Sequence, residues 1–93
     1  MTVRFVIPGP LTPLTGGRSA VEVQSPGNTL RDALQSLFAA YPGLGDRVAT
    51  EQGELRSHVN VFVGKEESRF TGGLATPVTE GDEISIIPAI SGG

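Results

Sequence analysis

Residues 28–43, NTLRDALQSLFAAYPG, decide the fold, because they contain the clearest periodic pattern in the chain. Asn28 or Thr29 can cap a helix, with Asp32 close to the positive end of its dipole, and Pro42 and Gly43 follow as a stop signal. Apolar residues recur at helical spacing along one side, at Leu30, Ala33, Leu34, Leu37, Phe38 and Tyr41. The stretch therefore predicts a single amphipathic helix that lies on a flat apolar surface.

Four segments with strand character flank this helix and can supply that surface. They are Val3–Ile7, Ala20–Gln24, Val59–Val63 and Glu83–Pro88. Residues 8–19 hold three prolines and three glycines and are expected to form a loop, and residues 44–58 are expected to be irregular, with one short helical turn near 45–49. One helix and one sheet predict an α+β fold of two layers, a mixed sheet packed against one main helix. Ninety-three residues are enough for one domain.

The alternation within the strands predicts which side chains face the helix. The inward set is Val21, Val23, Val59, Val61, Val63, Ile84 and Ile86. Phe62 and Ile87 then point away from the helix, together with Val6 and Arg4 if the first strand has the same phase. This apolar group is a candidate docking surface for a partner, and isolated surface apolar residues are the alternative interpretation. In the segment after the third strand, Phe70, Leu74 and Val78 are expected to pack onto the core.

Composition argues against several classes of function. The formal net charge is −3, and the seven basic residues are scattered, so we expect no nucleic-acid binding and no attachment to an anionic membrane. The chain has no cysteine, no span of about 20 apolar residues and no signal-peptide pattern, so a cytoplasmic protein is expected.

The sequence contains no recognisable catalytic or metal-binding motif. His58 is the single histidine, which argues against both a zinc site and a Ser/His/Asp arrangement. The glycine pairs in TGGRS and TGGLAT have no lysine at the spacing of a phosphate-binding loop, and Lys65 follows Gly64 in a predicted turn. We therefore expect a protein without catalytic activity and without a bound cofactor.

The last strand is followed closely by PAISGG, residues 88–93, which ends on two glycines. A terminal carboxylate reacts only after activation, for example as an acyl-adenylate, and must then enter the active site of another enzyme. Glycine is the narrowest and most adaptable tether for that purpose. A frayed end without a role is the alternative.

The order of elements, the GD turn, the closing strand with its proline and the final Gly-Gly resemble the ubiquitin-like sulfur carriers of the ThiS/MoaD type. The segments FVIPGPLTPLTGGRSAVEV, SHVNVFV and SRFTGGLAT most resemble the branch that serves bacterial cysteine biosynthesis. The resemblance implies a β-grasp domain over residues 1–88 and a flexible tail over 89–93. It implies that Gly93 carries the sulfur as a thiocarboxylate, with Ser91 and Gly92 as its tether.

The same resemblance implies the partners. An ATP-dependent adenylating and sulfurtransferase enzyme would activate Gly93, a synthase that uses pyridoxal phosphate (PLP) would take up the sulfur, and a JAMM-type zinc peptidase would release cysteine. ATP and PLP would thus belong to partners. Two alternatives stay open: a sulfur carrier for another pathway (molybdopterin, thiamine, tRNA thiolation or protein conjugation), and a ubiquitin-fold interaction module.

Overall fold

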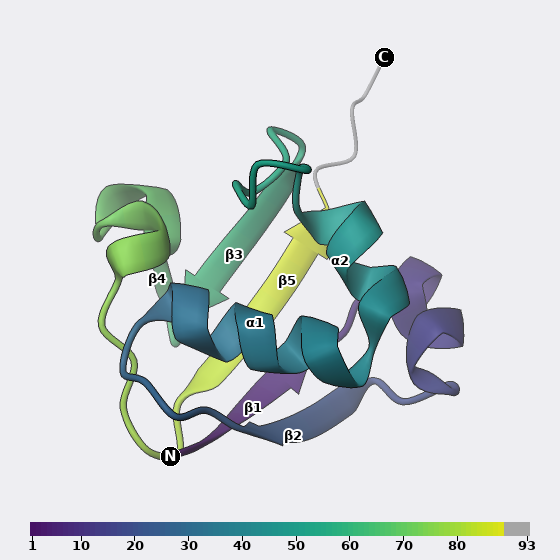
Figure 1. The fold of residues 1–93 in the computed structure, drawn as a ribbon, viewed down its shortest axis with the longest axis horizontal. Coiled ribbons are helices and arrows are strands. Elements are labelled where there is room, and N and C mark those ends of the chain that lie inside the picture. The colour runs from purple at the N-terminus through teal and green to yellow at the C-terminus, as the bar shows by residue number, and fades with distance from the viewer. Residues whose placement is uncertain (89–93) are drawn as a thin grey trace.

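A computed structural model describes residues 1–88 of the chain, and its centre is a five-stranded mixed sheet (Figure 1). The strands are β1 (Thr2–Val6), β2 (Ala20–Gln24), β3 (Val59–Val63), β4 (Glu66–Glu67) and β5 (Glu83–Pro88). They lie in the order β2-β1-β5-β3-β4. The two strands furthest apart in sequence, β1 and β5, pair in parallel, and the other neighbours pair antiparallel. This is the predicted mixed sheet, in a β-grasp arrangement.

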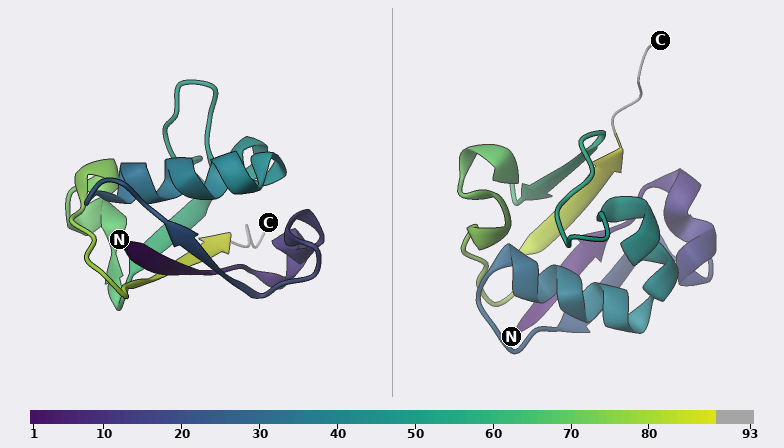
Figure 2. Two further views of the ribbon diagram at one scale, coloured as in Figure 1. Left: turned by 60° about the horizontal axis from the view of Figure 1, so that its bottom comes forward. Right: turned by 45° about the horizontal axis from the view of Figure 1, so that its top comes forward.

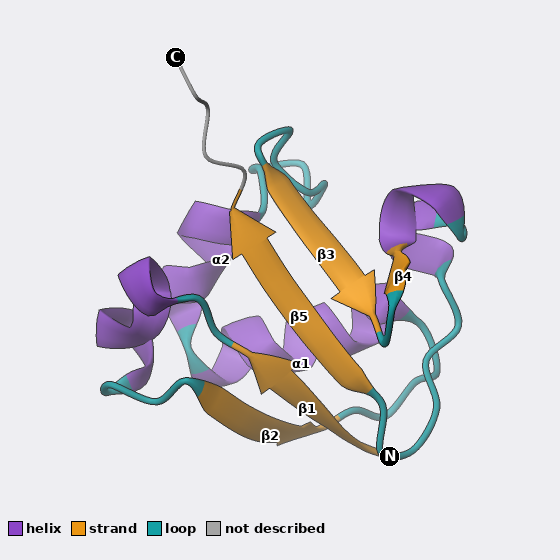
Figure 3. Cartoon of the chain, turned by 180° about the vertical axis from the view of Figure 1, so that it is seen from behind, coloured by secondary structure: helices purple, strands orange, loops and turns teal. Residues whose placement is uncertain are grey.

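The helices α1 (Leu30–Ala40) and α2 (Pro42–Val48) cover one face of the sheet (Figure 2). Three 3-10 helices complete the described elements: η1 (Gly9–Thr15), η2 (Ser68–Phe70) and η3 (Gly73–Ala75). The opposite face of the sheet is turned toward the viewer in Figure 3, and no described helix crosses it. The structure is therefore the predicted pair of layers, a sheet and one main helix with a short second helix.

Helix α1 begins where the sequence predicts it. The hydroxyl of Thr29 accepts a hydrogen bond from the backbone N–H of Asp32 at 3.3 Å, which satisfies one of the orphan donors of the first turn. Its other end is also as predicted, because α1 ends at Ala40 with Tyr41 as its cap, directly before Pro42 and Gly43. A second helix that the stop signal did not indicate follows at once, and Pro42 occupies the first turn of this α2, where the missing N–H of proline costs nothing.

The core lies between α1 and the sheet and contains every side chain predicted to face inward except Val63, which is partly buried and packs against it. Phe5, Leu30, Leu37, Leu44 and Ile84 are its largest fully buried members. Leu44 and Val48 of α2 also belong to it, so the short helical turn expected near 45–49 is present and supplies core side chains. The helical stripe of α1 is confirmed, with Phe38 and Tyr41 at its half-buried end.

Two expectations need correction. The segment 8–19 is not wholly a loop, because Gly9–Thr15 form η1. Phe70 does not pack onto the core and is 79 % exposed, whereas Val78 is buried and Leu74 packs against the core as expected. The physical reason is the turn η2, in which Ser68 takes the inward position and Phe70, two residues later, points to solvent.

Candidate docking surface

The open face of the sheet presents the side chains that alternate with the core residues. Val6 and Phe62 each stand opposite Ser85 in the strand register, on β1 and β3 respectively. Ile87 lies two residues further along β5, opposite Asn60. Val6, Phe62 and Ile87 thus surround Ser85 on three neighbouring strands, and we call these three residues the apolar patch.

The predicted orientation of the apolar patch is confirmed. Val6 and Phe62 are half-buried by their neighbours on the sheet, and Ile87 is 46 % exposed. No helix of residues 1–88 covers this face, which leaves the patch open within the described part of the chain (Figure 3). Its role in docking stays a prediction.

Charged side chains border the patch on the β1 side. Arg4, the fourth residue predicted for this surface, is exposed and stands opposite Glu22 on β2 and Glu83 on β5. Both carboxylates belong to exposed residues on the same face. Arg4 is therefore flanked by two carboxylates, which give this border of the patch a net negative charge. Such a border is complementary to a partner with basic groups around an apolar centre.

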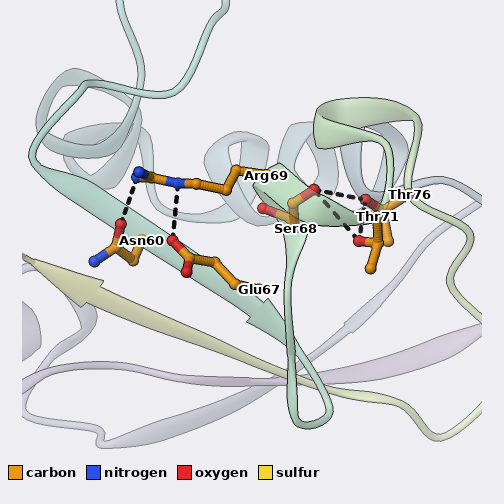
Figure 4. Close-up of polar contacts among 6 residues, drawn as sticks. All are labelled: Asn60, Glu67, Ser68, Arg69, Thr71 and Thr76. Atoms are coloured by element: carbon orange, nitrogen blue, oxygen red, sulfur yellow. Dashed lines mark hydrogen bonds and ion pairs between the residues drawn. The ribbon is translucent and has the colours of Figure 1, made fainter.

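A second border, on the β3 and β4 side, was not anticipated from the sequence. Arg69 donates a hydrogen bond from Nη2 to Asn60 Oδ1 at 2.7 Å, and its Nε lies 2.8 Å from Glu67 Oε1 (Figure 4). In the register, Asn60 faces Ile87 and Glu67 faces Phe62, so Arg69 lies along the edge of the apolar patch. In the sequence, the only indication of this border is that Arg69 follows the acidic pair Glu66–Glu67 by two positions.

A hollow in the described part of the chain adjoins the second border. It has a volume of about 460 Å³ and runs between α1, residues 52–57 and the η2–η3 segment, where Arg31, Leu55 and Leu74 contribute to its walls. None of the three patch residues lines it, whereas Asn60, Glu67 and Arg69 of the second border do. The candidate docking surface is consequently a flat sheet face, suited to a protein rather than to a small ligand.

The structure offers no metal site among residues 1–88, where no three His, Asp or Glu side chains gather. His58 is exposed just before β3. No helix in that range is long and apolar enough to cross a membrane. The predicted carrier residue Gly93 and its predicted tether, Ser91 and Gly92, lie outside the described residues; the description ends at Pro88, opposite Val59 in β3.

Comparison with known proteins places this geometry in a family. The ThiS family model matches residues 5–93. The chain is 40 % identical over 95 residues to the sulfur carrier protein CysO of Mycobacterium tuberculosis, with all of both chains covered. It is 42 % identical over 65 residues to small archaeal modifier protein 3 of Haloferax volcanii, covering 70 % of each chain.

Solved structures agree with this assignment. The crystal structure of M. tuberculosis CysO superimposes with a TM-score of 0.83 at 39 % identity, over 95 % of this chain and 99 % of that one. A chain of the BexX/CysO complex of Amycolatopsis orientalis gives a TM-score of 0.86 at 34 % identity, over 98 % and 99 %. The fold is that of the ubiquitin-like sulfur carriers. The protein belongs to the ThiS family, and the resemblance stated from the sequence is confirmed.

Proposed function

We propose that this protein carries sulfur on the carboxyl group of Gly93 as a co-substrate of partner enzymes and performs no catalysis itself. The observation that carries the proposal is the match to the ThiS family over residues 5–93, together with 40 % identity to a sulfur carrier protein over the full length of both chains. The sequence adds a chemical reason: Gly92 and Gly93 have no side chains, so a narrow active site can enclose the carboxylate.

The proposed chemistry has two steps, both on a partner enzyme. The Gly93 carboxylate attacks the α-phosphate of ATP, which forms an acyl-adenylate and releases pyrophosphate. A sulfur nucleophile at the oxidation level of sulfide then attacks the acyl carbon and expels AMP, leaving a thiocarboxylate. Because the chain contains no cysteine, no thiol of its own competes for the activated acyl group.

Docking of the sheet face would support this chemistry energetically. Ordering a short peptide segment in an active site costs about 1–2 kcal/mol for each residue. Burial of the apolar patch against the partner can offset this cost, and Ile87 lies six residues before Gly93 along the chain. A solved complex that contains a CysO protein with BexX supports docking between a carrier of this fold and a second protein.

For the destination of the sulfur we propose cysteine biosynthesis, on the basis of the likeness to CysO. A PLP-dependent synthase would supply an aminoacrylate that the thiocarboxylate adds to, an S-to-N acyl shift would leave cysteine amide-linked to Gly93, and a JAMM-type zinc peptidase would release it. The likeness to a small archaeal modifier protein favours one second candidate, attachment of Gly93 to other proteins.

The proposal is tested by the intact mass of the protein after incubation with ATP, a sulfide source and the adenylating enzyme of its host. We expect a mass increase equal to the exchange of one oxygen for sulfur, localised to Gly93. Variants that lack Gly93 or carry one further residue after it are expected to show no exchange. Exchange in either variant, or none in the wild type with an enzyme that activates another carrier, would reject the proposal.

Adding the synthase and its aminoacrylate precursor separates the two destinations. Cysteine biosynthesis predicts a further mass increase equal to one aminoacrylate, because the carried sulfur becomes the sulfur of the cysteine. The product is then one cysteine residue heavier than the unmodified chain, and the zinc peptidase returns it to the unmodified mass. Protein attachment predicts instead a Gly93–lysine isopeptide bond in peptides from the host lysate.

A further inference from the structure

The segment SRFTGGLAT, residues 68–76, is a rigid structure at the edge of the open face. Within it, the hydroxyl of Thr76 donates to the carbonyl oxygen of Gly73 at 2.6 Å. The same hydroxyl lies 3.0 Å from the hydroxyl of Thr71 (Figure 4). The carbonyl oxygen of Ser68 lies 3.3 Å from Thr71 Oγ1 and 3.4 Å from Thr76 Oγ1. Ser68 and Thr76 are buried, so these bonds are shielded from water.

Both ends of the segment are fastened to the rest of the fold. Before it, β4 pairs with β3, and after it the backbone carbonyl of Thr76 accepts a hydrogen bond from the N–H of Leu30 at the start of α1. Gly72 and Gly73 have φ values of 121° and 60°, which side chains disfavour, and this reversal returns Thr76 to Ser68. The chain thus holds η2 in one place relative to the sheet.

This rigid turn displays two side chains of the kinds that dominate protein interfaces, a phenylalanine and an arginine. Phe70 is 79 % exposed, more than any other large apolar side chain in the described range. The Arg69 side chain is 55 % exposed, although Glu67 and Asn60 fix its position. An exposed aromatic ring and an ordered guanidinium lose little freedom on binding, which is typical of interface anchors.

Arg69 also retains donors for a partner. Its bonds to Glu67 and Asn60 use Nε and one N–H of Nη2, and among the contacts within residues 1–88 its Nη1 group makes none. The free edge of the guanidinium matches the two oxygens of a carboxylate. Through Asn60 and Glu67, this edge continues the apolar patch of Ile87 and Phe62.

From these observations we infer that Arg69 and Phe70 form a second recognition element for the enzyme that activates Gly93. The enzyme would present a carboxylate to Arg69 and an apolar pocket to Phe70, while the apolar patch covers its flat contact surface. The inference rests on the proposed function, because it assigns these contacts to the activating enzyme. Arg69 and Phe70 are exposed and are not part of the core, so this inference explains why the SRFTGGLAT segment displays them.

The test measures ATP–pyrophosphate exchange by the adenylating enzyme of the host as a function of carrier concentration. We expect Arg69→Gln and Phe70→Ala each to raise the KM for the carrier roughly tenfold while kcat changes less than twofold. The Arg69→Gln effect should shrink in 0.5 M NaCl, since salt screens an exposed charge contact, whereas the Phe70→Ala effect should persist. Arg47→Gln makes the same charge change on the exposed part of α2 and is the matched control, expected to leave the KM unchanged.

The outcomes separate the two proposals. If the wild-type chain supports no exchange, the carrier function itself fails, and this inference with it. If the wild type is activated and both variants match it at low salt, the carrier function survives and the recognition element is rejected. Circular dichroism of each variant shows whether a raised KM comes from lost contacts or from a damaged fold; a raised KM in an unfolded variant would count against the inference.

Discussion

Ile86 and Ile87 are neighbours on β5 with the same side chain and opposite surroundings. Ile86 is 2 % exposed and packs under α1, whereas Ile87 is 46 % exposed on the open face. The pleat of one strand thus separates the side chain that stabilises the fold from one available to a partner. The same change, isoleucine to alanine, can therefore be made at a core position and at a surface position of one strand.

Ile86→Ala is expected to lower the free energy of unfolding by about 2–5 kcal/mol, since it removes buried methyl groups and leaves a cavity. Ile87→Ala should change it by no more than about 0.5 kcal/mol. Urea denaturation of both variants checks this difference. Equal losses would show that the open face is covered in solution.

Phe62→Asp is expected to leave the domain folded and to weaken binding to the adenylating enzyme, because the half-buried side chain lies on the open face of β3, opposite Ser85. Leu34→Asp is the contrast, since it places a carboxylate in the core between α1 and the sheet and should unfold the protein. Circular dichroism and a binding titration distinguish these results. A Phe62→Asp variant that unfolds would contradict the assigned role of this residue.

The cap of α1 provides a prediction about helix stability. Thr29 accepts the backbone N–H of Asp32 and donates its hydroxyl hydrogen to Asp32 Oδ2 at 2.9 Å. Thr29→Ala should therefore lower the free energy of unfolding by about 1 kcal/mol. Thr29→Ser keeps the hydroxyl oxygen and should lower it much less. Chemical denaturation of the two variants measures the difference, and similar costs would show that the methyl group of Thr29 matters more than its hydroxyl.

Much of the fold could be predicted because the burial pattern is strongly periodic. Val21 and Val23 alternate with polar residues on β2, and the stripe from Leu30 to Leu37 follows the helical period. The orientation of Phe62 and Ile87 followed from the same alternation. The pairing of β1 with β5 was not derivable from local pattern, because a parallel pair between the two ends of the domain depends on the whole topology.

The errors concern short segments, in which single polar contacts outweigh hydrophobicity. Phe70 is apolar and is therefore predicted to lie inside, but the turn η2, held by the bond from the Thr71 hydroxyl to the Ser68 carbonyl, buries Ser68 and leaves Phe70 exposed. Arg69 was missed for a related reason. Its contact with Asn60 joins residues nine positions apart across a turn. The periodicity of helices and strands does not predict side-chain contacts of this kind.

The hydroxyl of Thr76 tests whether the SRFTGGLAT segment depends on its internal bonds. Thr76→Val keeps the shape of the side chain but removes the hydroxyl bond to Gly73 and the contact with Thr71, while the Gly73 carbonyl keeps the backbone N–H of residue 76 and the Thr71 hydroxyl keeps the Ser68 carbonyl. We expect a loss of about 0.5–1.5 kcal/mol in the free energy of unfolding, the net value of one hydrogen bond. The exposed Thr79 is the matched control, and Thr79→Val should change stability by less than about 0.5 kcal/mol.

Faster amide hydrogen exchange at Thr71 and Thr76 in the Thr76→Val variant would locate the loss in this segment. Unchanged stability and exchange would mean that packing, rather than the hydroxyl network, holds Arg69 and Phe70 in place.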